Sequence, residues 1–93
     1  MSHYIEVQDV HAANALLAEV PFANVMVAGN ISGLVAGEES TLHVREGRNT
    51  MDRLRNCARS DADVVIYRRS HWPEVNRIAQ NLADHGVQVL AIH

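Results

Sequence analysis

The sequence predicts an α/β fold, a single small domain in which three helices pack on a mostly parallel sheet of four or five strands. The short apolar runs Val25–Ala28 and Val64–Tyr67 are typical of strands that are covered on both faces. A helical pattern separates the second run from a final apolar run, Val87–Ile92, and such a β-α-β unit is parallel and right-handed. With 93 residues, 47% of them hydrophobic, the chain can build one core but not two. One domain is therefore expected over residues 1–93.

The first element expected is a short strand over His3–Val7. Asp9 is well suited to cap a helix, and the apolar residues that follow fall on one face of a helix over Val10–Val20. Pro21 then ends that helix, because proline cannot continue it. The buried strand Val25–Ala28 follows.

The next segment predicts a β-hairpin. Its arms would be Ile31–Ala36 and Thr41–Glu46, joined by a turn over Gly37–Ser40. In the second arm Leu42 and Val44 alternate with polar residues, which indicates that one face of the arm meets solvent.

Two helices and two strands complete the domain. Asn49 and Thr50 open the second helix, whose apolar stripe is Met51, Leu54, Cys57 and Ala58. The third helix has Pro73 in its first turn and ends at Gly86. The predicted order is thus strand, helix, strand, hairpin, helix, strand, helix, strand.

Charge is unevenly distributed along the chain. The net charge is −3, from 11 acidic and 8 basic residues, and every basic residue is Arg. Residues 1–44 contain five acids and no base, whereas residues 45–77 contain all eight Arg and five acids. Such segregation can make one face positive although the whole chain is acidic. Alternatively, these Arg residues pair with nearby acids on solvated helix faces.

The strand ends offer candidate residues for binding an anion. In parallel α/β sheets ligands bind beyond the carboxyl ends of the strands, next to helix N-termini. The strand Val64–Tyr67 would place a run of polar residues there, and two other segments would add further donors. The candidate anion-binding residues are Arg68, Arg69, Ser70, His71, Asn30 and Arg48. In the alternative interpretation Ser70 caps the third helix while Arg68 and Arg69 face solvent.

No catalytic or metal-binding motif is present. Gly29–Gly33 lacks the spacing of a phosphate-binding loop, and the chain has no Lys to complete one. The six His residues show no i,i+3 or i,i+4 pair and no accompanying Cys-x-x-Cys. Cys57 lies on an apolar stripe, which favours a structural role. The sequence therefore predicts no catalytic residue, no metal and no cofactor.

Composition also restricts the environment and the partners. One cysteine permits no internal disulfide and favours a reducing, cytoplasmic compartment. No apolar run approaches the ~20 residues of a membrane span, and the start resembles no signal peptide. The net negative charge and the lack of aromatic residues interleaved with Arg argue against nucleic-acid binding.

Three functions remain compatible with the sequence. The favoured one is a small non-enzymatic regulatory protein that acts through a protein partner, for example an inhibitor of a host system encoded by a phage or another mobile element. The second is a binding module for a nucleotide or another phosphorylated anion at the Arg-rich strand ends. The third is an enzyme whose site forms between subunits, because so short a chain seldom encloses a pocket alone.

Contacts with other chains are also expected. Trp72 beside the Arg pair is a candidate contact residue if it is exposed rather than packed on the core, and Arg45 is a second. A small sheet leaves an edge or face thinly covered, and Ile31–Glu46 is the candidate segment to pair with a neighbour. We expect a homodimer.

Overall fold

Five parallel strands form one sheet in the computed structural model, which describes residues 3–93. The elements are β1 Tyr4–Val7, α1 Val10–Leu17, β2 Asn24–Ala28, β3 Thr41–Arg45, α2 Thr50–Ala58, β4 Val64–Arg68, α3 Pro73–Asp84 and β5 Gln88–Ile92. The strand order is β1-β5-β4-β2-β3, and every neighbouring pair is parallel. The predicted α/β class is confirmed, with five strands and three helices, and so is the parallel β4-α3-β5 unit.

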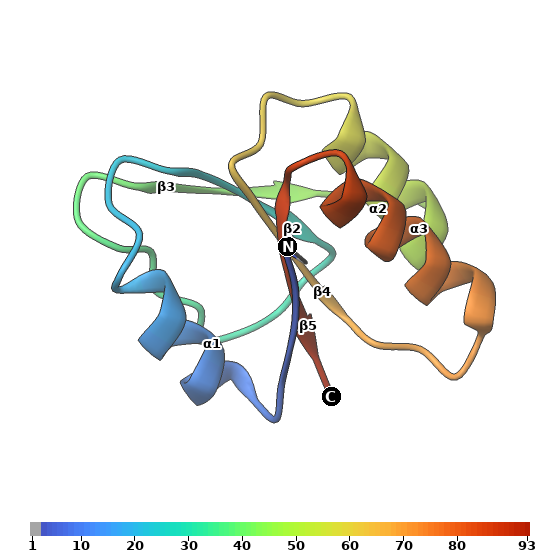
Figure 1. Ribbon diagram of the computed structural model, residues 1–93, viewed down its shortest axis with the longest axis horizontal. Helices are drawn as coiled ribbons and strands as arrows, with labels where there is room; N and C mark the ends of the chain where they lie inside the picture. Colours follow the sequence, from blue (N-terminus) through green and yellow to red (C-terminus); the bar gives the residue numbers. More distant parts are fainter. Residues whose placement is uncertain (1–2) are drawn as a thin grey trace.

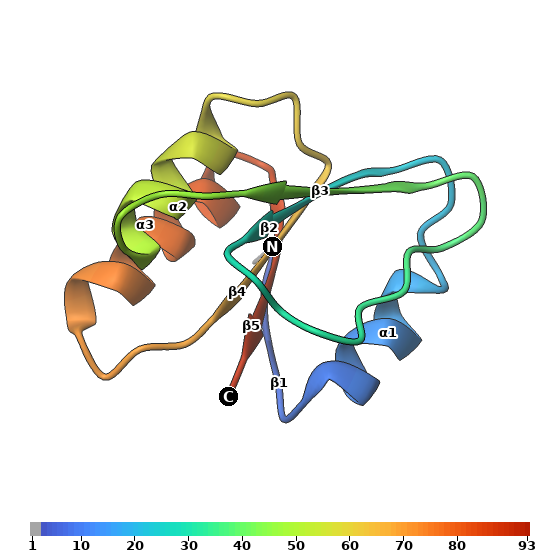
Figure 2. The ribbon, with the colours of Figure 1, turned by 180° about the vertical axis from the view of Figure 1, so that it is seen from behind.

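The helices cover the sheet from both sides. Figures 1 and 2 show α2 and α3 on one face and α1 on the other. Residues alternate between these faces along β4: Val65 and Tyr67 pack in the cluster beneath α2 and α3, whereas Val64 and Ile66 pack in the cluster on the α1 side. This alternation follows from the period of two of a β-strand, and it fixes the face to which each later residue points.

The connections place a topological switch at β5. The chain leaves β1 over the α1 face, and it leaves β4 over the α3 face. These two strands flank β5. In open α/β sheets, ligands bind in the crevice that opens at the carboxyl ends of strands where neighbouring connections diverge in this way. The carboxyl ends of β1, β5 and β4 are therefore one place where the topology favours a ligand.

The helix ends follow the predicted signals, with one difference. Asp9 accepts a hydrogen bond from the Ala12 amide (2.8 Å), and Asn49 caps α2 through the Asp52 amide (3.0 Å). Helix α1 ends at Leu17, three residues earlier than expected. The chain tightens before Pro21 into i→i+3 bonds, of which Val20 N–H to Leu17 C=O (3.0 Å) is the last.

The predicted hairpin is wrong. Only Thr41–Arg45 forms a strand, and it pairs with β2 in parallel, so no strand forms over residues 31–36. That segment crosses the α1 side as coil, where Asn14 binds the Gly33 carbonyl (2.9 Å) and the Val35 amide (2.8 Å). The turn over Gly37–Ser40 does form, with the Ser40 amide bonded to the Gly37 carbonyl (3.1 Å), but glycine is needed there for packing, because a Cβ at Gly37 would lie 2.4 Å from the Leu17 carbonyl oxygen.

Candidate functional site

A groove opens at the carboxyl ends of β4 and β5, beside the first turns of α3. Its volume is about 660 Å³. The residues that line it come from the segment after β4, from α3 and from the residue after β5. They are Arg69, Ser70, His71, Pro73, Asn76, Arg77, Gln80 and His93. The groove thus lies at the switch point that the topology defines.

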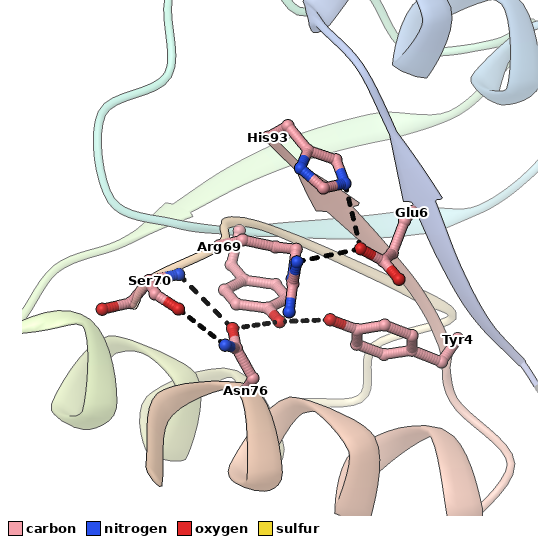
Figure 3. Close-up of polar contacts among 7 residues, drawn as sticks. Tyr4, Glu6, Arg69, Ser70, Asn76 and His93 are labelled. Carbon is pink, nitrogen blue, oxygen red and sulfur yellow. Dashed lines mark hydrogen bonds and ion pairs between the residues drawn. The ribbon is translucent and has the colours of Figure 1, made fainter. Parts of the chain in front are cut away.

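Glu6 joins two of the basic groove residues. Its Oε1 lies 3.0 Å from Arg69 Nη1 and 2.9 Å from His93 Nε2 (Figure 3). The three residues come from β1, the end of β4 and the end of β5, so the strand order β1-β5-β4 is what brings them together. About a third of the Arg69 side chain and half of the His93 side chain stay exposed. The ion pairs therefore face solvent and are weak individually.

Beneath these ion pairs lies a tyrosine pair. The Tyr4 and Tyr67 hydroxyls are 2.7 Å apart, and the Tyr67 hydroxyl donates to Asn76 Oδ1 at 2.9 Å. Burial raises the pKa of Tyr67 well above its usual range, and the hydrogen bond with Tyr4 adds to the effect. The hydrogen bond that Arg69 donates to the Tyr4 hydroxyl and the charge of Glu6 in turn raise the pKa of Arg69. Tyr67 is thus held neutral and Arg69 charged.

Asn76 connects this tyrosine pair to the loop that opens α3. Its Oδ1 also accepts from the Ser70 amide (3.3 Å), and its Nδ2 donates to the Ser70 carbonyl (2.6 Å). Ser70 Oγ accepts from the Trp72 amide (3.1 Å), while Trp72 occupies the N-cap position without a side-chain cap bond. Ser70 therefore shapes the loop before the helix, and one side chain from α3 holds both polar groups of its backbone.

Three of the six predicted anion-binding residues meet in the groove: Arg69, Ser70 and His71. Arg68 does not join them. It continues the alternation of β4, in which Tyr67 faces α3, so the Arg68 side chain points to the α1 side while Arg69 returns to the groove. This corrects the expectation that the two guanidinium groups share one rim.

The other predicted residues lie elsewhere. Asn30 is exposed after β2 and does not line the groove. The Arg48 side chain is 95% exposed and approaches Asp52 at 4.0 Å. Arg45, a predicted contact residue, lines a separate hollow with Arg59, and its Nε is buried without a hydrogen-bond partner among the described residues.

Trp72, the other predicted contact residue, is 57% exposed. It lines a smaller cleft of about 250 Å³ between the first turns of α2 and α3, with Met51 and Val75 as apolar neighbours. The interpretation in which Trp72 packs into the core is therefore wrong. Ser70 lines both this cleft and the groove, so the two hollows adjoin.

The sequence did not indicate the α3 side of the groove. Asn76, Arg77 and Gln80 come from one helix face. Counted from Asn76, the other two residues follow after one and four positions, a spacing that places all three on one face of a helix. Polar residues on one face of an amphipathic helix equally indicate a solvated surface, so this pattern did not identify a binding site. Glu6 was missed because nothing in the sequence reveals that β1 and β4 flank β5.

The groove gathers basic side chains that can bind an anion. Arg77 makes no ion pair among residues 3–93, so its charge is available to a ligand, and two imidazoles and a second guanidinium stand around the same groove. The described residues include no group of three or more His, Cys, Asp or Glu that could hold a metal ion. Guanidinium groups bind carboxylate and phosphate through two parallel hydrogen bonds, so the groove chemistry fits an anion.

The chain matches no protein-family model and no curated protein sequence. Its function has therefore to be inferred from the geometry of the groove. Within the described part of the chain, no helix combines the length and the apolar character needed to cross a bilayer.

Replacing Asn76 tests whether it holds the groove together. Asn76→Ala leaves the Tyr67 hydroxyl and the Ser70 amide without their acceptor, and it should lower the free energy of unfolding by about 2–3 kcal/mol. Asn81→Ala is the matched control, because Asn81 lies in the same helix with an exposed side chain, and it should change stability by less than about 0.5 kcal/mol. Urea denaturation measures both. Equal effects of the two substitutions would show that Asn76 is only a surface residue.

Proposed function

We propose that the protein binds a phosphorylated small molecule, or another compact anion, in the groove at the carboxyl ends of β4 and β5. The observation that carries the proposal is the gathering of Arg69, Arg77, His71 and His93 around one hollow at the switch point of a parallel sheet. These side chains come from the segments after β4 and β5 and from α3, although they are spread over 25 positions of the sequence.

The start of α3 supports an anion at this place. The Trp72 and Val75 amides are already bonded and Pro73 has no N–H, so the start of α3 contributes the partial positive charge of the helix dipole rather than a set of free donors. The helix is 12 residues long, so its dipole is fully developed. The bonds between Asn76 and Ser70 fix the loop in front of the helix, so its backbone is ordered before a ligand arrives.

Glu6 restricts the kind of anion. Its carboxylate already pairs with Arg69 and contacts His93, whereas no acidic residue among residues 3–93 forms an ion pair with Arg77 or His71. A ligand that carries one phosphate can use Arg77 without displacing Glu6. The proposal is therefore a module for a monophosphate or carboxylate ligand, with binding and no reaction at its centre.

Arg77 is the residue to test. Arg77→Gln removes a guanidinium that has no acid partner in the described part of the chain. It should weaken binding of a monophosphate such as AMP by about tenfold or more, as expected for loss of a charge-assisted hydrogen bond. Isothermal titration calorimetry at low salt measures the dissociation constants of AMP and of inorganic phosphate.

Arg59→Gln is the control for Arg77→Gln, because Arg59 also lacks an ion pair among the described residues and does not line the groove. It should leave the affinity within about twofold, since its charge is screened. If both variants bound equally well, or if the unaltered protein bound neither AMP nor phosphate, the anion proposal would be excluded.

A second candidate function, a regulatory protein that acts through a protein partner, is favoured by Trp72. Its side chain is 57% exposed in an apolar cleft, and exposed tryptophans beside arginines are common anchors of protein interfaces. The cleft adjoins the groove, so a partner could contact both.

Trp72→Ala tests this second candidate. The change should remove a partner that the unaltered protein captures in stoichiometric amount from a bacterial lysate, because truncation of an anchor residue costs about 2 kcal/mol or more. Phe22→Ala is the control, since Phe22 is 75% exposed and lies outside the Trp72 cleft. Capture that is lost with both variants, or with neither, would count against Trp72 as the anchor.

A further inference from the structure

Strand β3 is an edge strand whose side chains meet solvent. It lies at the end of the sheet, and only β2 pairs with it. Four of its five residues are exposed, including Leu42 (36%) and Val44 (49%). Strands of parallel sheets are normally buried on both faces, so this exposure is unusual.

The outward hydrogen-bonding groups of β3 belong to Leu42 and Val44. The Thr41 amide donates to the Ala23 carbonyl (3.0 Å), and the Arg45 carbonyl accepts from the Gly29 amide (3.1 Å), so these two residues bond toward β2. Along a strand, successive residues direct their amide and carbonyl groups to opposite sides. The amides and carbonyls of Leu42 and Val44 therefore point away from the sheet, where a further strand could bond to them.

One face of β3 also lacks a helix. On the side of α2, that helix packs against β2, β3 and β4. On the other side, α1 lies over β1 and β5 and shares a core cluster with Val25 of β2 and Val64 of β4, so within the described structure it is β3 that lacks a helix there. Figure 2 shows β3 running past α1 rather than beneath it. Leu42 and Val44 point to this uncovered side, because they alternate with Arg45, which lies near Cys57 beneath α2.

The opposite edge of the sheet is different. Strand β1 has only four residues, and one of them is the charged Glu6. The Glu6 carboxylate contacts Arg69 and His93. A charge within a short edge strand discourages pairing with another chain. The protein thus protects one edge and leaves the other open.

We propose that the open edge pairs with a second copy of this chain, through antiparallel β3–β3 contact about a two-fold axis at His43. In this register Leu42 lies opposite Val44 of the partner subunit, and each pair exchanges two backbone hydrogen bonds. The outward-facing amides and carbonyls of Leu42 and Val44 in each copy then all have hydrogen-bond partners. The sheet becomes continuous across the dimer, and Leu42 and Val44 of both copies form one apolar cluster on the uncovered face.

Charge complementarity favours a second copy as the occupant. The residues just before β3 include the exposed acids Glu38 and Glu39, and those just after it include the exposed Arg48. Antiparallel pairing places the start of one strand beside the end of the other, so acids of each copy face arginines of its partner at both ends of the seam. Glu46 offsets only part of this attraction. A two-fold contact also closes on itself, so the assembly stops at a dimer.

Single-cysteine cross-linking tests the register. Facing residues of a non-hydrogen-bonded antiparallel pair have Cα atoms about 4.5 Å apart, within the range of a disulfide. His43→Cys should therefore give a disulfide-linked dimer under mild oxidation. Thr41→Cys should not, because its two copies would lie roughly 13 Å apart. The natural Cys57 should not interfere, since burial raises its pKa to about 11.

A charge swap tests the same arrangement without cysteines. Glu38→Arg and Arg48→Glu should each weaken the dimer by about tenfold in sedimentation equilibrium, because each turns attraction into repulsion at two symmetric places. The double variant E38R/R48E should recover most of the loss. Circular dichroism checks that each variant keeps its fold.

The unaltered protein should sediment at twice its monomer mass of 10.3 kDa at micromolar concentration. A monomer at that concentration would overturn the proposal. So would a dimer in which Thr41→Cys cross-links as readily as His43→Cys, or in which the double charge variant is weaker than either single variant.

Discussion

A parallel sheet imposes one constraint on which the rest of this structure depends: every strand ends at the same edge, and every helix that follows a strand begins there. In this protein β5 lies between β1 and β4, whose connections depart over opposite faces. The residue after β5, His93, therefore lies in the crevice between them. That single arrangement brings Glu6, Arg69 and His93 within hydrogen-bonding distance and places the first turns of α3 beside them.

The buried Tyr67 links the core to the residues that form the groove. Tyr67 is fully buried in the core cluster under α2 and α3, yet its hydroxyl reaches both Tyr4 on β1 and Asn76 on α3. A buried hydroxyl without partners would cost free energy, so the packing of the core and the position of α3 are coupled. Asn76 extends the coupling to the backbone of Ser70. The groove is thus anchored in the hydrophobic core.

Local signals predicted most of the fold. The apolar runs of β2, β4 and β5 and the caps Asp9 and Asn49 act through neighbouring residues, so the sequence reveals them directly. The hairpin prediction failed because the strand after the Gly37–Ser40 turn pairs in parallel with β2 instead of turning back on residues 31–36, and this choice of partner is not a local property of the sequence. In the site, the residues after β4 were found from their position. Glu6 and Arg77 could be assigned to the site only from the tertiary structure, because their positions depend on strand order and helix orientation. The same holds for the opposite directions of the Arg68 and Arg69 side chains.

The most direct test of the account is a titration of ¹⁵N-labelled protein with inorganic phosphate, followed by NMR chemical shifts. If the groove at the carboxyl ends of β4 and β5 is the binding site, saturable shifts should be concentrated in the amides of Arg69 to Arg77 and in His93, which line or border it. Shifts of similar size at arginines outside the groove, such as Arg48, Arg55 and Arg59, would contradict the account, because they would indicate only non-specific screening of surface charge.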